Sequence, residues 1–162
     1  MWLAILGGVA VGLLVAMFIV LRQERGYRAM FSDTHLTELA MTLEAARTGE
    51  ARPTSLGIAV RWQRKPEHVA IVLESRQPLA PAAATFLLAF ALELVRRAEV
   101  TAALQLDRRR YALVFTHAAL DAARPIEETT DATLPAIRGH AADQMKALPL
   151  SQVGAAGLAA YG

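Results

Sequence analysis

The amino-acid sequence predicts an α+β fold, with one N-terminal transmembrane helix before a small domain of about four strands packed with helices. Three observations support this fold class. The first 21 residues are apolar and uncharged, two pairs of segments alternate apolar and other residues, and the segments around these pairs have helical apolar spacing. We divide the chain into a transmembrane helix, a basic juxtamembrane linker, a cytoplasmic α+β domain and an uncharged Gly/Ala-rich tail, at residues 1–21, 22–31, 32–148 and 149–162.

The composition excludes several classes of protein. The chain has 162 residues, of which 54% are hydrophobic, and a formal net charge of +2. It is too apolar to be disordered and too evenly charged to be a dedicated nucleic-acid binder. Because it has no cysteine, it has no disulfide framework and no thiolate zinc or iron–sulfur site. Arginine outnumbers lysine by 15 to 2, which suggests a GC-rich bacterial genome.

Residues 1–21 contain no charged side chain. As a helix, this run spans about 30 Å, the thickness of the hydrocarbon core of a bilayer. Trp2 and Tyr27 flank it, where aromatic residues favour the membrane surface. A cleaved signal peptide is the alternative, but no basic residue precedes the run and bulky, charged residues follow it. We therefore expect a single-pass transmembrane helix.

The charges beside this segment predict its orientation. Arg22, Arg25 and Arg28 follow it and are opposed only by Glu24, whereas the chain from residue 29 carries 14 basic and 14 acidic side chains. Basic flanks stay on the cytoplasmic side of a membrane. We expect the N-terminus outside the inner membrane and the domain in the cytoplasm, with a periplasmic domain as the alternative. The arginines would then lie near anionic lipid headgroups.

Small residues form a stripe along the predicted transmembrane helix. Ala4, Gly8, Gly12 and Ala16 recur every four residues, and the central pair is a GxxxG match. Small residues let two helix backbones approach closely, which favours association in lipid. The alternative is that glycine and alanine are simply common in such helices. We expect this stripe to contact another membrane protein or a second copy of the chain.

The first part of the domain reads as a helix followed by a hairpin. Residues 32–48 carry an apolar stripe at helical spacing and end before Gly49. Residues 56–63 and 68–75 both alternate with period two, and a short polar segment with Pro66 joins them. This pattern predicts two antiparallel strands.

A helix is expected next, at residues 80–98, with Pro81 in its first turn. Its stretch at 79–92 is uncharged, so a second membrane span is the alternative. Fourteen residues are short for a span, and Glu93, Arg96 and Arg97 close the stretch. We expect a buried central helix packed on a sheet.

The last part of the domain predicts a second hairpin and two helices. Its strands are expected at 101–106 and 111–116, a short helix at 117–124, and a last helix at 132–148 with Gly139 weakening its middle. The uncharged tail at 149–162 would be mobile by itself.

Motifs for nucleophilic, nucleotide or metal chemistry are absent from the sequence, which has no GxSxG, Walker loop, GxGxxG, HExxH or EF-hand. We expect no cofactor, no metal and no catalytic residue. His117, with Asp121 four residues on, is the strongest candidate for acid–base chemistry, but no partner nucleophile accompanies it. His35 and Glu38 lie one helical turn apart and offer only two metal donors.

Arg108, Arg109 and Arg110 form the densest basic cluster of the domain, at the expected tip of the second hairpin. Such a cluster can contact an acidic partner, a phosphate or a lipid headgroup. A solvated turn that protects a sheet edge is the alternative.

These features favour a non-catalytic, single-pass accessory or assembly subunit of a larger bacterial membrane complex, of respiratory, photosynthetic or secretion type. Its partners would be membrane proteins or a second copy, together with anionic lipid, and not nucleic acid. Two alternatives stay open: a membrane-tethered sensor or small-ligand-binding module, and a membrane-bound enzyme that uses His117.

Overall fold

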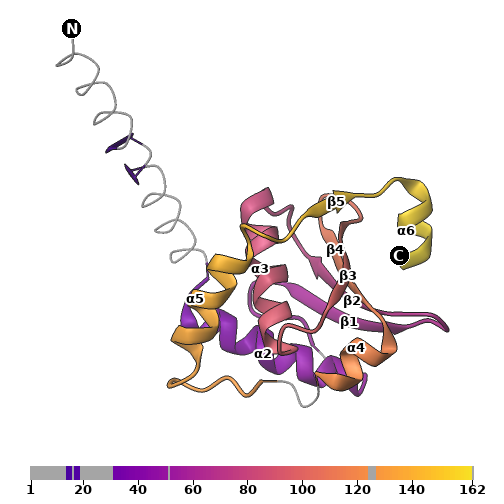
Figure 1. The fold of residues 1–162 in the computed structure, drawn as a ribbon, viewed down its shortest axis with the longest axis horizontal. Coiled ribbons are helices and arrows are strands. Elements are labelled where there is room, and N and C mark those ends of the chain that lie inside the picture. Colours follow the sequence, from indigo (N-terminus) through magenta and orange to yellow (C-terminus); the bar gives the residue numbers. More distant parts are fainter. Residues whose placement is uncertain (1–13, 16, 19–30, 51, 124–126, 162) are drawn as a thin grey trace, which may run out of the picture. The chain divides into compact units, whose positions relative to one another are not determined.

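The computed structural model describes residues 14–15, 17–18, 31–50, 52–123 and 127–161 (Figure 1). The chain divides into two compact units, Met1–Ser32 and Asp33–Gly162. Among the described residues, no helix is long and apolar enough to cross a membrane. Most of residues 1–21, where we predict the transmembrane helix, lie outside the described ranges. The span therefore stays a prediction.

The second unit has an α+β fold built on one mixed sheet. Its elements, in chain order, are α2 (Asp33–Arg47), β1 (Ile58–Arg64), β2 (Val69–Ser75), α3 (Pro81–Leu94), β3 (Val100–Gln105), β4 (Arg110–Phe115), α4 (His117–Ala122), α5 (Leu134–Gln144), β5 (Leu150–Gln152) and α6 (Ala155–Tyr161). The α+β class and the order of the elements through α5 are confirmed, with ends that differ by at most four residues.

The sheet has five strands in the order β1-β2-β4-β3-β5. Both predicted hairpins are present, because β1 pairs antiparallel with β2 and β3 pairs antiparallel with β4. The two hairpins join through the antiparallel pair β2–β4, in which Ile71 lies opposite Leu113. The fifth strand, β5, is parallel to β3. We expected about four strands, and the structure has one more, the short edge strand β5.

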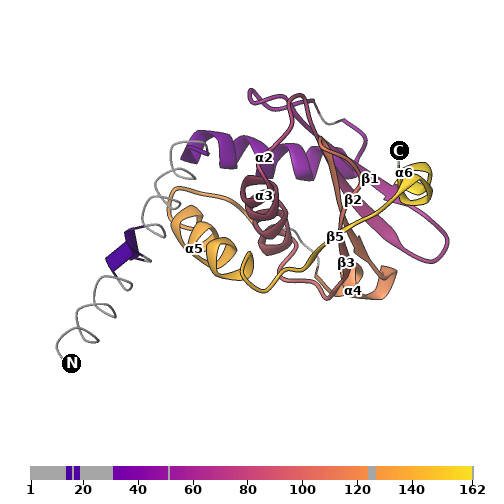
Figure 2. The same ribbon diagram turned by 90° about the horizontal axis from the view of Figure 1, so that it is seen from above.

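One face of the sheet is covered by the helices α2 and α3. Figure 2 shows α2 and α3 on the same side of the sheet, with α5 beside α3. α3 is buried almost throughout, from Ala83 to Leu94, which agrees with a central helix packed on a sheet. Its Phe90 is fully buried and stacks on Phe86, with ring centroids 6.4 Å apart.

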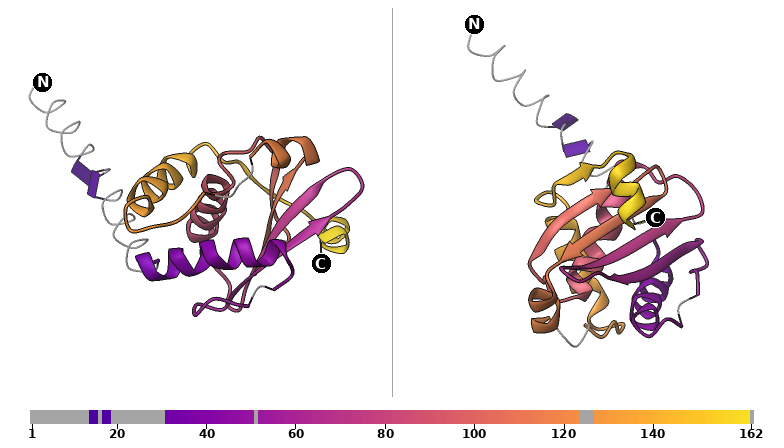
Figure 3. Two further views of the ribbon diagram at one scale, coloured as in Figure 1. Left: turned by 90° about the horizontal axis from the view of Figure 1, so that it is seen from below. Right: turned by 90° about the vertical axis from the view of Figure 1, so that its right-hand side faces the viewer.

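The opposite face of the sheet is covered by α6. Figure 3 shows α6 across the sheet from α2 and α3. Five buried residues form the apolar centre of this face, which we call the outer cluster, and Leu158 and Tyr161 of α6 pack against it: Ala70, Val72, Leu106, Ala112 and Val114.

The tail we expected at 149–162 thus contains β5 and α6. The expectation of mobility applied to this segment by itself, and in the structure its described residues pack on the domain. The segment has three glycines and no charge, but it also has a few apolar side chains that pack on the open face of the sheet.

Candidate functional sites

Arg108, Arg109 and Arg110 lie at the turn between β3 and β4, which we call the arginine turn. Asp107 orders this turn. Asp107 Oδ1 accepts hydrogen bonds from the backbone N–H of Arg109 at 2.7 Å and of Arg110 at 2.8 Å. Its Oδ2 accepts from Arg110 Nε at 2.8 Å. On the neighbouring strand, the Ser75 N–H donates to the Arg109 carbonyl at 2.8 Å. These hydrogen bonds fix the backbone of the turn, which lies at the predicted hairpin tip.

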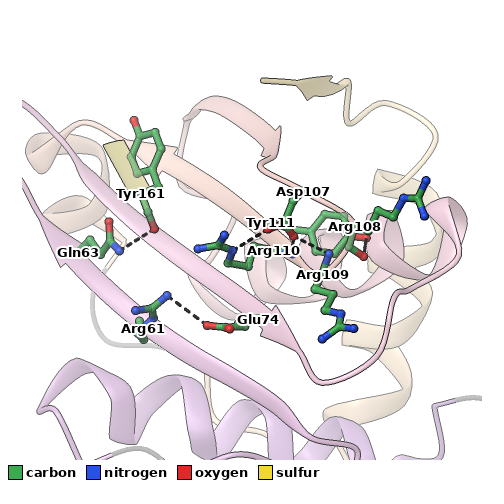
Figure 4. A network of polar contacts seen from close by, with 9 residues as sticks. All are labelled: Arg61, Gln63, Glu74, Asp107, Arg108, Arg109, Arg110, Tyr111 and Tyr161. Carbon is green, nitrogen blue, oxygen red and sulfur yellow. Dashed lines mark hydrogen bonds and ion pairs between the residues drawn. The ribbon is translucent and has the colours of Figure 1, made fainter. Parts of the chain in front are cut away.

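The three arginines of this turn have different surroundings. Arg110 is paired with Asp107 and only a quarter of its side chain is exposed. Arg108 and Arg109 are exposed, and in the described part of the chain their guanidinium groups make no hydrogen bond or ion pair. Figure 4 shows these two side chains extending away from Asp107. Of the predicted anion contacts, two are thus available to a partner and Arg110 is already engaged.

Two titratable groups at this turn have shifted pKa values. Partial burial acts to raise the pKa of Asp107, but the hydrogen bonds from Arg109 and Arg110 outweigh it, so the pKa lies below its ordinary value. Burial raises the pKa of Tyr111, and the Asp107 carboxylate adds to this. The Tyr111 hydroxyl donates to the Arg108 carbonyl at 3.2 Å. Asp107 is thus the ionised centre of the turn at neutral pH.

A second polar site lies between the end of α3 and α5, and no local sequence pattern indicates it. An open pocket of about 530 Å³, which we call the α3–α5 pocket, lies there. Its lining residues are Glu93, Arg96, Arg97, Glu127, Ala132, Thr133, Ala136, Ile137 and His140. Pockets of this size bind small molecules in many proteins. In the sequence, Glu93 and the two arginines indicate only the charged end of an apolar helix, and the topology brings His140 to them.

Glu93 is the buried charge of this pocket, with 7% of the residue exposed. Arg97 Nε donates to both of its carboxylate oxygens, at 3.0 and 2.9 Å. His140 Nδ1 lies 3.8 Å from Glu93 Oε2, and Arg96 Nε lies 3.3 Å from Glu127 Oε2. A buried carboxylate needs such partners, because an unpaired one is costly to desolvate.

The backbone at Arg96 and Arg97 is strained. Their φ angles are 54° and 55°, and among the described residues no other non-glycine residue has a positive φ. Such conformations cost about 1–3 kcal/mol each and tend to occur at functional sites. They end helix α3, where glycine is the usual residue. Two arginines stand there instead, beside the pocket.

The predicted histidine sites have structural contacts. His117 Nε2 lies 2.8 Å from the Lys65 carbonyl, so this nitrogen carries the proton and donates. His117 begins α4, whose cap is Thr116, in agreement with a histidine at a helix start. Glu38 accepts hydrogen bonds from the hydroxyl and N–H of Ser55, and these lower its pKa. In the described ranges, no three His, Asp or Glu residues group as metal ligands.

The remaining predicted site residues lie outside the described ranges. The small-residue stripe consists of Ala4, Gly8, Gly12 and Ala16. The membrane-surface residues are Trp2, Arg22, Arg25, Tyr27 and Arg28. Their contacts stay predictions. Between them, Leu14, Val15, Met17 and Phe18 are helical, and these apolar residues are each 52–64% exposed.

A comparison with known proteins found no family whose model matches this chain, and no similar curated protein or solved structure.

Proposed function

We propose that the chain is a membrane-anchored, non-catalytic accessory or assembly subunit of a larger bacterial membrane complex. One observation carries the anchor. Leu14, Val15, Met17 and Phe18 are helical and apolar, yet more than half of each is exposed. Large apolar side chains gathered on an exposed helix are typical of a segment that meets lipid or another protein. Their place inside the uncharged run at 1–21 favours lipid.

The arginine turn supports the accessory role of the domain. Arg108 and Arg109 are exposed on a backbone that Asp107 holds in place. Arginine forms paired hydrogen bonds with carboxylates, and a fixed turn loses less entropy on binding than a flexible loop. An acidic patch on a neighbouring subunit therefore suits this turn.

Labelling of single-cysteine variants of the full chain tests the anchor and its orientation. The natural chain has no cysteine, so Ser151→Cys, at an exposed residue, introduces the only thiol. A membrane-impermeant maleimide should label it only after the inner membrane is opened. Recovery of the intact chain in the soluble fraction, or an N-terminus cleaved after the apolar run, would overturn the anchor.

The small-residue stripe predicts how the anchor associates. Gly8→Leu with Gly12→Leu should weaken association in mild detergent, because leucine side chains separate the helix backbones. Val9→Leu with Val11→Leu places leucine at neighbouring positions that are not part of the stripe and serves as the control. Equal association of both variants would exclude a role for the stripe.

A small-ligand-binding module is a second candidate function, and the α3–α5 pocket favours it. The pocket combines a buried carboxylate, two strained arginines and an apolar wall. Native mass spectrometry of the full chain, released gently from detergent, should then detect a small molecule that is lost on mild activation.

A further inference from the structure

We propose that the α3–α5 pocket binds a short-chain organic anion, whose carboxylate or phosphate group is held by Arg96 and Arg97. This inference rests on the second candidate function, the ligand-binding module, and names its ligand class. It is independent of the membrane anchor. Its site joins α3 and α5, which lie side by side in Figures 2 and 3.

The first argument is the balance of hydrogen-bonding groups. The buried acceptor, Glu93, has both oxygens occupied by Arg97 Nε. Arg96 approaches Glu127 most closely through its own Nε. Within the described residues, the terminal Nη groups of both arginines make no hydrogen bond with the protein. Since each guanidinium has five N–H donors, the two arginines keep more free donors than the Glu127 carboxylate offers free acceptors, which favours an anion.

The second argument is the backbone at these two residues. Glycine adopts the φ angles of 54° and 55° without strain, whereas arginine does not. The ion pair of Arg96 with Glu127 leaves 48% and 39% of the two side chains exposed, and such exposed pairs contribute little to stability. Stability therefore does not explain arginine at position 96. An anion bound by the Arg96 guanidinium gives a reason for arginine at this position.

The third argument is the shape of the remaining wall. Ala132, Ala136 and Ile137 line the pocket beside the polar residues. A ligand with a few methylene groups would bury them there, each gaining affinity by roughly fourfold. His140, whose Nδ1 lies 3.8 Å from Glu93 Oε2, belongs to the same lining. These surroundings select a short organic anion over inorganic phosphate.

Isothermal titration calorimetry on the full chain in a neutral detergent tests the proposal. The probes are butyl phosphate, butanoate, inorganic phosphate and butylamine. Butyl phosphate and butanoate should bind, and butylamine should not. Inorganic phosphate should bind at least about tenfold more weakly than butyl phosphate, because it lacks the methylene groups that each add roughly fourfold when buried. Failure of both organic anions, or equal binding of butyl phosphate and inorganic phosphate, would overturn the ligand class.

Three variants locate the site. Arg96→Gln should weaken butyl phosphate binding by at least about tenfold, because a charge-assisted hydrogen bond is lost. Arg109→Gln removes an equal charge from the distant arginine turn and should leave affinity unchanged. Glu127→Gln removes the group that competes for Arg96 and should tighten binding a few-fold. Equal losses in the two arginine variants would show diffuse attraction and no site.

A fourth variant separates binding from folding. Arg96→Gly relieves the backbone strain, so the melting temperature of the unliganded chain should rise while binding of butyl phosphate is lost. A lower melting temperature would mean that Arg96 is needed for the fold, and retained affinity would mean that it does not hold the anion. Either result contradicts the proposal. A detected co-purified molecule that is not an anion would support the binding module and refute this ligand class.

Discussion

The two faces of the sheet are built differently. The face under α2 and α3 carries large apolar side chains, such as Ile71, Tyr111, Leu113 and Phe115, and all four are buried. The face under α6 has alanine and valine in its outer cluster. Beside this cluster, Arg61 and Glu74 pair at 3.2 Å with both side chains nearly half exposed (Figure 4).

This difference shows what each face contributes. Large side chains between a sheet and two long helices bury much apolar surface, which is the main source of folding free energy. The seven-residue α6 covers a smaller apolar area. Its end is held by polar contacts, since Gln63 Nε2 donates to the Tyr161 carbonyl at 2.9 Å and the Tyr161 hydroxyl lies 3.1 Å from His68 Nε2. We expect the first face to govern unfolding of the domain and the second to be locally separable.

The largest effect is expected at the centre of the first face. Phe90→Ala removes a fully buried ring from α3 and should lower the free energy of unfolding by about 3–5 kcal/mol, because a cavity is left. Denaturant unfolding of the full chain in detergent, followed by circular dichroism, measures this. A loss below about 1 kcal/mol would contradict a core centred on α3.

A smaller effect is expected on the second face. A Cβ at Gly157 would come within 2.5 Å of Val153 Cγ2, and Val153 packs against the outer cluster. Gly157→Ala should therefore displace Val153, costing about 1–2 kcal/mol, and should speed hydrogen exchange of α6 but not of α3. Equal acceleration in both helices would show that the two faces unfold together.

Substitution of Gly139 should have the opposite effect on stability. Gly139 lies within α5, and a Cβ there would meet no atom within 4 Å. Gly139→Ala should therefore raise the free energy of unfolding by about 0.5–1 kcal/mol, because alanine has the higher helix propensity. Thermal melting of the full chain measures the change, and destabilisation would contradict the packing of α5 given by the structure.

A substitution at Asp107, in the arginine turn, should have the smallest effect on the free energy of unfolding. Asp107 is partly exposed, so Asp107→Asn should cost less than about 1 kcal/mol at pH 7. The folded pKa of Asp107 lies below its ordinary value. The stabilisation by the carboxylate is therefore present above the ordinary carboxyl pKa of about 3.9, and is lost as the pH falls through the folded pKa. The stability difference between the natural chain and the variant should shrink over that range. A difference that is constant with pH would contradict the lowered pKa.

Much of the domain could be predicted from local sequence. The alternation of Val69, Ile71 and Leu73 with their neighbours identified β2, and the polar residues at 107–110 identified a hairpin tip. The arginine turn was found because its three residues are adjacent in sequence. The α3–α5 pocket was not found, because Glu93 and His140 are 47 positions apart and only the packing of α3 on α5 brings them to one site.

The sequence by itself determined the α+β class, the two hairpins and the buried helix between them, because hydrophobic periodicity and turn residues act over a few neighbouring positions. Tertiary structure alone decided the fifth strand, the use of the last residues to cover the second face and the assembly of the α3–α5 pocket. These features depend on which distant surfaces remain uncovered once the sheet forms, and no local pattern encodes that.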